Sequence, residues 1–198
     1  MADNTQKLLE RLGLAGLIPF VGLAGLTWLL PGTEQPGALL AQAPTALATY
    51  AALIVSFLGG LHWGAIWLKM AEQSTPEIPM PAVGWGVLPS LLAWPGLFLP
   101  VAWSLWWMGA LLLLCYVVDR KLFPLLGLQR WLRLRLWLSS VAGLSCFVAA
   151  MALATGAAVA QTGLIAFVGL AAPHLVRSIV RVTHERHIVL SSLMGAVL

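Results

Sequence analysis

One histidine lies near the middle of the apolar run that most clearly predicts a membrane span. His62 falls in residues 46–69, a length that matches the ~20 residues needed to cross a bilayer core as a helix. It precedes Lys69 and should lie roughly 10 Å inside the membrane at 1.5 Å per residue. A buried polar ring needs a partner. We expect a neutral imidazole, because burial disfavours the charged ring, that donates to a neighbouring helix. Ligand binding, a proton relay, and metal or haem ligation are the alternatives.

Asp119 is the second candidate, at the end of another apolar run. It is followed directly by Arg120, and we expect the two to pair at the cytoplasmic end of a helix, with a functional role as the alternative. The two cysteines, Cys115 and Cys146, also fall inside apolar runs and lack the CxxC or Cys/His spacing of zinc and redox sites. We interpret both as apolar packing residues.

Motifs for nucleophilic, metal-dependent or nucleotide chemistry are missing from the sequence. It contains no G-x-S-x-G, H-E-x-x-H, P-loop or dinucleotide fingerprint, and no two carboxylates face one another within an apolar run. We therefore predict a protein that is not an enzyme, with no catalytic residue, no metal site and no cofactor.

The composition defines the class of protein that must position these residues. The chain has 198 residues, of which 60% are hydrophobic and 9% charged, and its mean hydropathy is +0.91. A soluble domain of this size would show more polar surface. The net charge of +4 comes from basic residues between apolar runs, not from a basic face for nucleic acid. We predict an all-α integral membrane protein whose first partner is the lipid bilayer.

Five apolar runs predict the transmembrane helices of a bundle: residues 12–30, 46–69, 83–100, 102–118 and 136–155. Pro19 predicts a kink in the first, and Pro89 and Pro95 interrupt the third. One or two apolar segments follow, at residues 164–176 and 188–198. We expect a five-helix transmembrane bundle over residues 1–155 and an apolar, basic C-terminal segment over residues 156–198.

Small residues in the second run predict how its helix packs. Ser56, Gly60 and Gly64 recur at every fourth residue, so they share one helix face on which a neighbouring helix can approach closely. Gly59 and His62 lie beside this face, and Trp63 lies toward the end near Lys69, where an aromatic ring suits the headgroup layer. We expect this face to be a helix contact within the bundle or with another subunit.

The basic residues predict the orientation. When the run at residues 164–176 is counted as a crossing after the five spans, all 11 lysines and arginines fall in alternate connections, and by the positive-inside rule these are cytoplasmic. The connection at residues 155–163 should then be an outer loop. We predict a multi-pass protein of the bacterial inner membrane with a cytoplasmic N-terminus.

Several stretches carry a family resemblance. LGLAGLIPFVGLAGL, YAALIVSFLGGLHWG, GWGVLPSLLAWPGL, and YVVDRKL with WLRLRLWLSS resemble the transmembrane protein 69 family of small bacterial and mitochondrial membrane proteins. The resemblance covers about residues 8–150. It implies a compact bundle of about five helices and no particular reaction, because the domain has no known function.

The C-terminal part resembles a different family. In GLIAFVGLAAPH, the residues Gly163, Phe167, Gly169, Pro173 and His174 match a motif of FecCD-type permeases of ABC importers, with Ala166 in place of a glycine. In that family the motif forms a cytoplasmic segment that contacts the ATPase, whereas the positive-inside argument puts Gly163 outside. The final run, 188–198, is also too short to span. We expect the last quarter to be fused, truncated or frame-shifted, or its last run to lie at the interface.

Two classes of function compete on these observations. Small-residue helix faces and few polar groups in the spans favour a structural, accessory or assembly subunit that docks onto a larger membrane complex. A permease-type transport component coupled to an ABC ATPase is the alternative, and a haem- or quinone-binding subunit of a redox complex is a second one.

Overall fold

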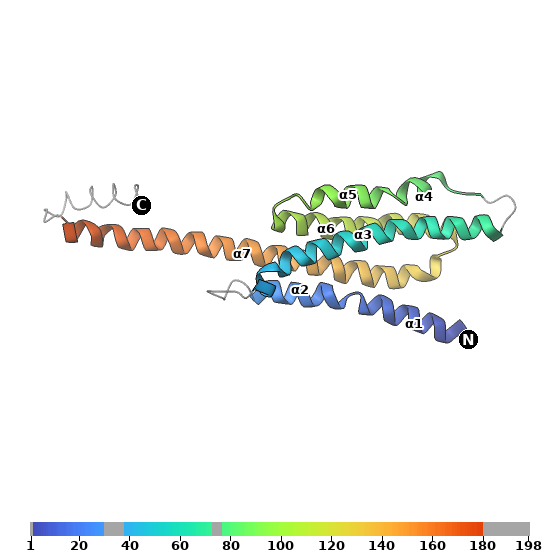
Figure 1. The fold of residues 1–198 in the computed structure, drawn as a ribbon, viewed down its shortest axis with the longest axis horizontal. Helices are drawn as coiled ribbons and strands as arrows, with labels where there is room; N and C mark the ends of the chain where they lie inside the picture. The colour runs from blue at the N-terminus through green and yellow to red at the C-terminus, as the bar shows by residue number, and fades with distance from the viewer. Residues whose placement is uncertain (1, 30–37, 73–76, 180–198) are drawn as a thin grey trace. The chain divides into compact units, whose positions relative to one another are not determined.

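The fold is entirely helical in the part of the chain that the structure describes. The computed structural model describes residues 2–29, 38–72 and 77–179, and every regular element there is a helix (Figure 1). By compactness the chain divides into two units, Met1–Leu153 and Ala154–Leu198. The helices of the first unit are α1 Ala2–Ala15, α2 Ile18–Leu29, α3 Ala38–Glu72, α4 Met80–Trp85, α5 Leu88–Gly96 and α6 Val101–Leu122, and α7 Leu132–Ile179 begins there.

Four stretches of the described residues are long and apolar enough to cross a membrane: Asn4–Leu29, Leu40–Glu72, Val101–Leu122 and Gln129–Val168. The prediction of an all-α integral membrane protein is confirmed. The expected span at residues 83–100 is not a continuous helix, however, but the two short helices α4 and α5 beside α3. The helix α4 ends ahead of Pro89, because proline lacks the N–H that would bond the carbonyl four residues earlier and its ring clashes with that carbonyl.

The first span is broken as its sequence predicts. A turn at Gly16 and Leu17 separates α1 from α2, just ahead of Pro19, so the expected kink is confirmed. The Tyr50 hydroxyl on α3 donates to the Gly16 carbonyl oxygen at 3.1 Å. The Tyr50 ring also meets Phe20 edge-on, with ring centroids 5.1 Å apart. A side chain of the central helix α3 thus provides a hydrogen-bond donor for a carbonyl at the break between α1 and α2.

The central helix α3 packs against α2, α4, α5 and α6. Its inward face is formed by buried residues at helical spacing, namely Ala51, Val55, Leu58, His62 and Ile66. Of the two contacts expected of the small-residue face, the one within the bundle is not formed, because Gly60 and Gly64 are exposed and an added Cβ at either would meet nothing within 4 Å. The close approach occurs one residue earlier, where a Cβ on Gly59 would lie 2.7 Å from the Gly86 carbonyl oxygen.

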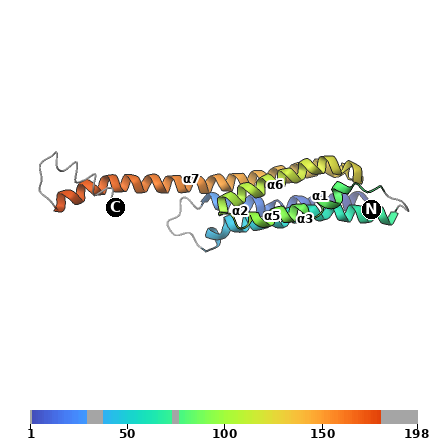
Figure 2. The ribbon, with the colours of Figure 1, turned by 90° about the horizontal axis from the view of Figure 1, so that it is seen from above.

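A tight connection joins α6 to α7. It contains the two 3-10 turns Pro124–Leu126 (η2) and Gln129–Trp131 (η3), and Gly127 between them has φ of 76°, a left-handed conformation that glycine adopts without strain. The Leu128 N–H donates back to the Phe123 carbonyl at 2.9 Å. The chain therefore reverses direction, and the first turns of α7 return along the last turns of α6 (Figure 2).

Beyond residue 153, α7 continues without interruption to Ile179. The outer loop expected at residues 155–163 is therefore wrong. The stretch between Thr155 and Gly163 holds three alanines, the strongest helix formers, and no proline. Without that loop the chain does not turn back before Arg177. The positive-inside argument for the orientation therefore rests only on the eight basic residues from Lys7 to Arg135. The run at 188–198 lies outside the described residues.

Candidate functional site

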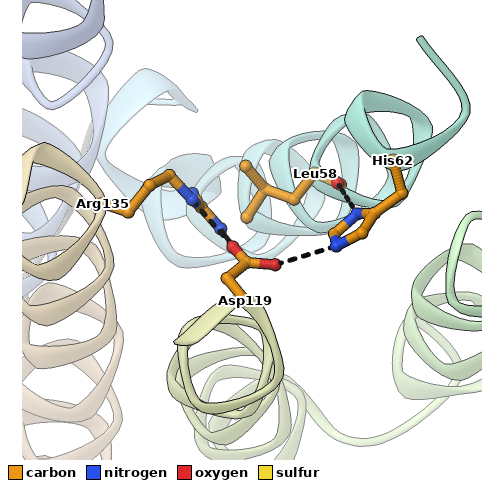
Figure 3. A network of polar contacts seen from close by, with 4 residues as sticks. All are labelled: Leu58, His62, Asp119 and Arg135. Carbon is orange, nitrogen blue, oxygen red and sulfur yellow. Dashed lines mark hydrogen bonds and ion pairs between the residues drawn. The ribbon is translucent and has the colours of Figure 1, made fainter. Parts of the chain in front are cut away.

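A buried network of polar side chains joins three helices of the first unit. His62 of α3, Asp119 of α6 and Arg135 of α7 meet in the interior (Figure 3). Arg135 Nε donates to Asp119 Oδ2 at 2.9 Å, and Arg135 Nη2 donates to the same oxygen. The other carboxylate oxygen, Oδ1, lies 3.3 Å from His62 Nε2. One carboxylate thus links an arginine and a histidine from two different helices.

Burial sets these residues apart from the other charged side chains. His62, Asp119 and Arg135 are 0%, 1% and 7% exposed, whereas Arg120 and Arg133, their neighbours in sequence, are exposed. Charges in a low-dielectric interior are tolerated when they are paired and hydrogen-bonded. The Arg135–Asp119 pair meets this requirement, because the buried guanidinium and carboxylate compensate each other.

The histidine ring lies between two acceptors. Nδ1 is 3.3 Å from the Leu58 carbonyl oxygen, and Nε2 faces the carboxylate of Asp119. A neutral imidazole carries a single N–H and can donate to only one of them. Accordingly, Nε2 and Oδ1 are both buried without a well-formed hydrogen bond among the described residues. Both contacts are satisfied together only when a second proton is present, on the ring or on the carboxylate.

The environment of the ring is otherwise apolar. Phe123, at the end of α6, packs on His62 with ring centroids 5.5 Å apart at an angle of 51°, and it is itself buried. Cys115 lies one turn before Asp119 on α6 and is buried and free, as expected for an apolar packing residue. Among the described residues no group of histidine, cysteine and acidic side chains is placed to hold a metal ion.

One expectation about this site is corrected. Asp119 pairs with Arg135 and not with Arg120, because consecutive helix residues point about 100° apart and do not face each other. The carboxylate that faces His62 also comes from Asp119, on a neighbouring helix, and a search within one span cannot find it.

Sequence reasoning did not single out Arg135, which it assigned to a cytoplasmic connection. A signal was available in Arg133 and Arg135, which stand two residues apart. Residues two apart on a helix point about 200° apart, so only one of them can face solvent from a packed helix. The inward one then requires a buried acidic partner, and Asp119 is the acidic residue nearest to it in the sequence.

The remaining candidates near His62 have structural partners. Trp63 Nε1 donates to the Val83 carbonyl at 2.9 Å, and its ring covers Gly86, where a Cβ would lie 2.1 Å from it. Ser56 donates to the Ala52 carbonyl of its own helix at 2.9 Å. Of the five residues in the permease-like motif, Gly163 and Phe167 are exposed on α7. The other three, Gly169, Pro173 and His174, are within α7, but their side chains lie outside the described part.

These features define a multi-pass α-helical membrane protein with a charged network enclosed between three of its helices. The chain belongs to the family described as protein of unknown function (DUF3429), whose model matches residues 5–151. That range includes all three network residues. The chain is also 40% identical over 83 residues to transmembrane protein 69 of Xenopus tropicalis; the match covers 42% of this chain and 29% of that protein.

The resemblance of the first 150 residues is thereby confirmed, and the comparisons give no support to the permease resemblance of residues 154–198. No solved structure matches the chain.

Proposed function

We propose that the protein is a non-catalytic accessory or assembly subunit that binds, within the membrane, a transmembrane helix of a larger complex. The observation that carries this proposal is the outward face of α3. Gly60 and Gly64 are exposed, with nothing of this chain within 4 Å of an added Cβ, and Ser56 lies one turn before Gly60. Small residues on a lipid-facing surface let two helix backbones approach closely, which drives helix association in membranes.

The surroundings of this face support the same proposal. Leu53, Phe57 and Trp67, on the same helix, are 64%, 62% and 71% exposed, so the small residues form a shallow strip bordered by large apolar side chains. A surface of this shape accommodates a second helix whose large side chains lie opposite the small residues of the strip. The residues of the polar network, in contrast, are buried between the helices of this chain.

The orientation proposed is a cytoplasmic N-terminus in the inner membrane of a bacterium. The N-terminus, the C-terminal end of α3 and the α6–α7 connection lie at one end of the first unit (Figure 1), and these are the segments that hold the basic residues up to Arg133. Lys69 Nζ donates to the Leu125 carbonyl oxygen at 2.8 Å, which ties two of them together. A cluster of lysine and arginine at one end favours the cytoplasmic side.

The test places a photo-crosslinking amino acid at position 60 and follows the adduct in native membranes. We expect a transmembrane subunit of a larger complex to be crosslinked. Gly60→Leu should then reduce the assembled form of that complex on native gels. Gly25→Leu is the matched control, because Gly25 on α2 is also exposed with nothing within 4 Å of an added Cβ. Adducts with lipid alone, or with a second copy of this chain, would refute the proposal.

Among the alternatives, a proton-accepting transport component has one observation in its favour, the His62 ring between two acceptors. Proteoliposomes with an imposed membrane potential would then show a proton flux that His62→Leu abolishes. The haem alternative is disfavoured, because the two ring nitrogens of His62 face Leu58 and Asp119 and neither is directed to an open position. Coupling to an ABC ATPase depended on the cytoplasmic segment that the motif at residues 163–174 implies, and these residues lie within the helix α7.

A further inference from the structure

A cavity adjoins the polar network at Arg135. It has a volume of about 200 Å³ and is walled by α1, α2, α3, α6 and α7. Its polar lining residues are Arg135 and Ser139, one turn apart on α7. The rest of the wall is glycine and apolar residues: Leu12, Gly13, Gly16, Leu17, Phe20, Ile54, Phe57, Leu58, Leu112, Leu138 and Ala142. It is a mainly apolar site with two polar groups on one wall, which is the usual composition of small-molecule sites.

Ser139 is the first sign that this wall serves a ligand. Serines in helices commonly donate to the carbonyl four residues earlier, and Ser56 and Ser145 do so here at 2.9 Å. Ser139 does not. It is 2% exposed, and its hydroxyl has no hydrogen-bond partner among the described residues. Because the hydroxyl can change rotamer without breaking a bond, it is free to donate to a molecule in the cavity.

Arg135 provides the second donor. Its Nε and Nη2 are used by Asp119. An arginine has five N–H groups in a fixed planar arrangement, so donors remain after the carboxylate is bound. The two lining residues therefore offer N–H and O–H groups to the cavity.

The charge balance selects a neutral acceptor. The positive charge of Arg135 is already compensated by Asp119, so an anionic ligand would add an uncompensated negative charge in an apolar interior, which is costly. A carbonyl oxygen accepts hydrogen bonds and adds no charge. The ligand head group should therefore be a neutral carbonyl.

The size and opening of the cavity indicate the shape of the ligand that carries this carbonyl. An apolar cavity of ~150 Å³ holds one benzene ring, so this one accommodates a single substituted ring system and little more. Leu12 and Phe57 line it and are 60% and 62% exposed, so the wall reaches the lipid-facing surface. A ring with a long apolar tail can enter from the bilayer and leave its tail among the lipids.

We propose that this cavity binds the head group of a membrane quinone, with a quinone carbonyl accepting from Ser139 Oγ and Arg135. The proposal concerns binding only and assigns no electron transfer to this chain. The cavity and the docking face on α3 share Phe57, but neither proposal rests on the other.

The test uses the full-length protein in nanodiscs and titrates decylubiquinone or a short-chain menaquinone analogue, followed by quenching of tryptophan fluorescence. We expect saturable binding of at least one of the two, and the difference between them identifies the ring type. Ser139→Ala should weaken binding about three- to tenfold, the range for the loss of one hydrogen bond. Ser145→Ala is the matched control, because Ser145 is buried on the same helix but bonded to Val141.

A second pair of variants tests the location independently of the hydrogen bond. At Gly13, a lining residue, an added Cβ would make ordinary contacts, at 3.5 Å from Leu138, so Gly13→Leu should fill the cavity and abolish binding. Gly22→Leu, at an exposed position of α2 with nothing within 4 Å of its Cβ, should leave binding unchanged. Thermal unfolding of each variant confirms that the bundle is intact.

Three results would overturn the proposal. These are the absence of saturable quenching with both quinones, equal binding by the Gly13→Leu and Gly22→Leu variants, and equal or tighter competition by a fatty acid, which would show that the head group is anionic.

Discussion

Asp119 and Arg135 face each other across the α6–α7 connection, with Arg135 Nε 2.9 Å from Asp119 Oδ2. The pair is separated by 16 residues, and the reversal of the chain between them contains Gly127 in a left-handed conformation. A buried ion pair of this kind is costly to break from one side, because the remaining charge is left unpaired in the interior. It therefore makes the packing of α6 on α7 specific in register.

Removal of one partner of the Asp119–Arg135 pair should destabilise the bundle more than removal of both. Asp119→Leu and Arg135→Met should each cost about 3–5 kcal/mol, and the double variant should recover much of this loss because no unpaired charge remains. The measurement is reversible unfolding in mixed micelles. Arg133→Met, at an exposed position two residues away, is the control and should change stability little. Additive losses in the double variant would contradict a direct pair.

The stability of His62 variants should depend on how far the new side chain reaches toward Asp119. Glutamine places its amide near the position of Nε2 and keeps a donor to Oδ1, whereas asparagine reaches only the Leu58 carbonyl. We expect His62→Gln to be the mildest and His62→Leu the most severe, at about 1–3 kcal/mol, because the leucine leaves a buried carboxylate oxygen without its contact. Equal unfolding free energies for the three variants would show that the His62–Asp119 contact contributes nothing.

The two adjacent glycines of α3 should respond oppositely to alanine. A Cβ on Gly59 would be 2.7 Å from the Gly86 carbonyl oxygen, so Gly59→Ala forces the backbones apart and should cost about 1–3 kcal/mol, the usual range for overpacking. Gly60→Ala meets nothing within 4 Å and should be neutral or slightly stabilising, because alanine is the better helix former. If Gly60→Ala lowered the free energy of unfolding as much as Gly59→Ala, Gly60 would have to face the interior, and the observed packing of α3 would be contradicted.

The topology can be read from single cysteines. Cys115 and Cys146 are buried and can be replaced by alanine to give a background without thiols. A cysteine at Arg130, in the α6–α7 connection, should be labelled by a membrane-impermeant reagent only from the cytoplasm. A cysteine at Gln42, exposed at the start of α3, should be labelled only from the outside. The reverse pattern in intact cells would invert the proposed orientation.

The second unit should be dispensable for the first. The compact unit Met1–Leu153 contains the polar network and the cavity, so a chain ending at Gly156 should insert and unfold at nearly the temperature of the full-length protein. Circular dichroism in detergent provides the comparison. Aggregation of the shortened chain, or a large fall in its unfolding temperature, would show that residues 157–198 stabilise the bundle.

Much of this fold is predictable because the bilayer imposes few solutions. Apolar runs of sufficient length located the helices, and Pro19 and Pro89 located two breaks, since proline acts through local geometry. The inward faces were harder to predict, because in lipid both faces of a helix are apolar. Periodicity therefore could not separate Gly59 from Gly60. Asp119 and His62 were recognised singly, but their contact depends on how three helices pack, which local sequence does not encode.

Two tryptophans determine how the interrupted segment from α4 to α5 is held. The Trp63 ring covers Gly86 and donates to the Val83 carbonyl, and the Trp107 ring covers Gly96 and donates to the Leu92 carbonyl at 2.8 Å. In hydrocarbon no water can accept from an indole N–H, and both tryptophans belong to the helices that flank this segment. The short helices α4 and α5 therefore supply the acceptors that α3 and α6 need. Loss of this segment would leave two indole N–H groups without a partner in the bilayer.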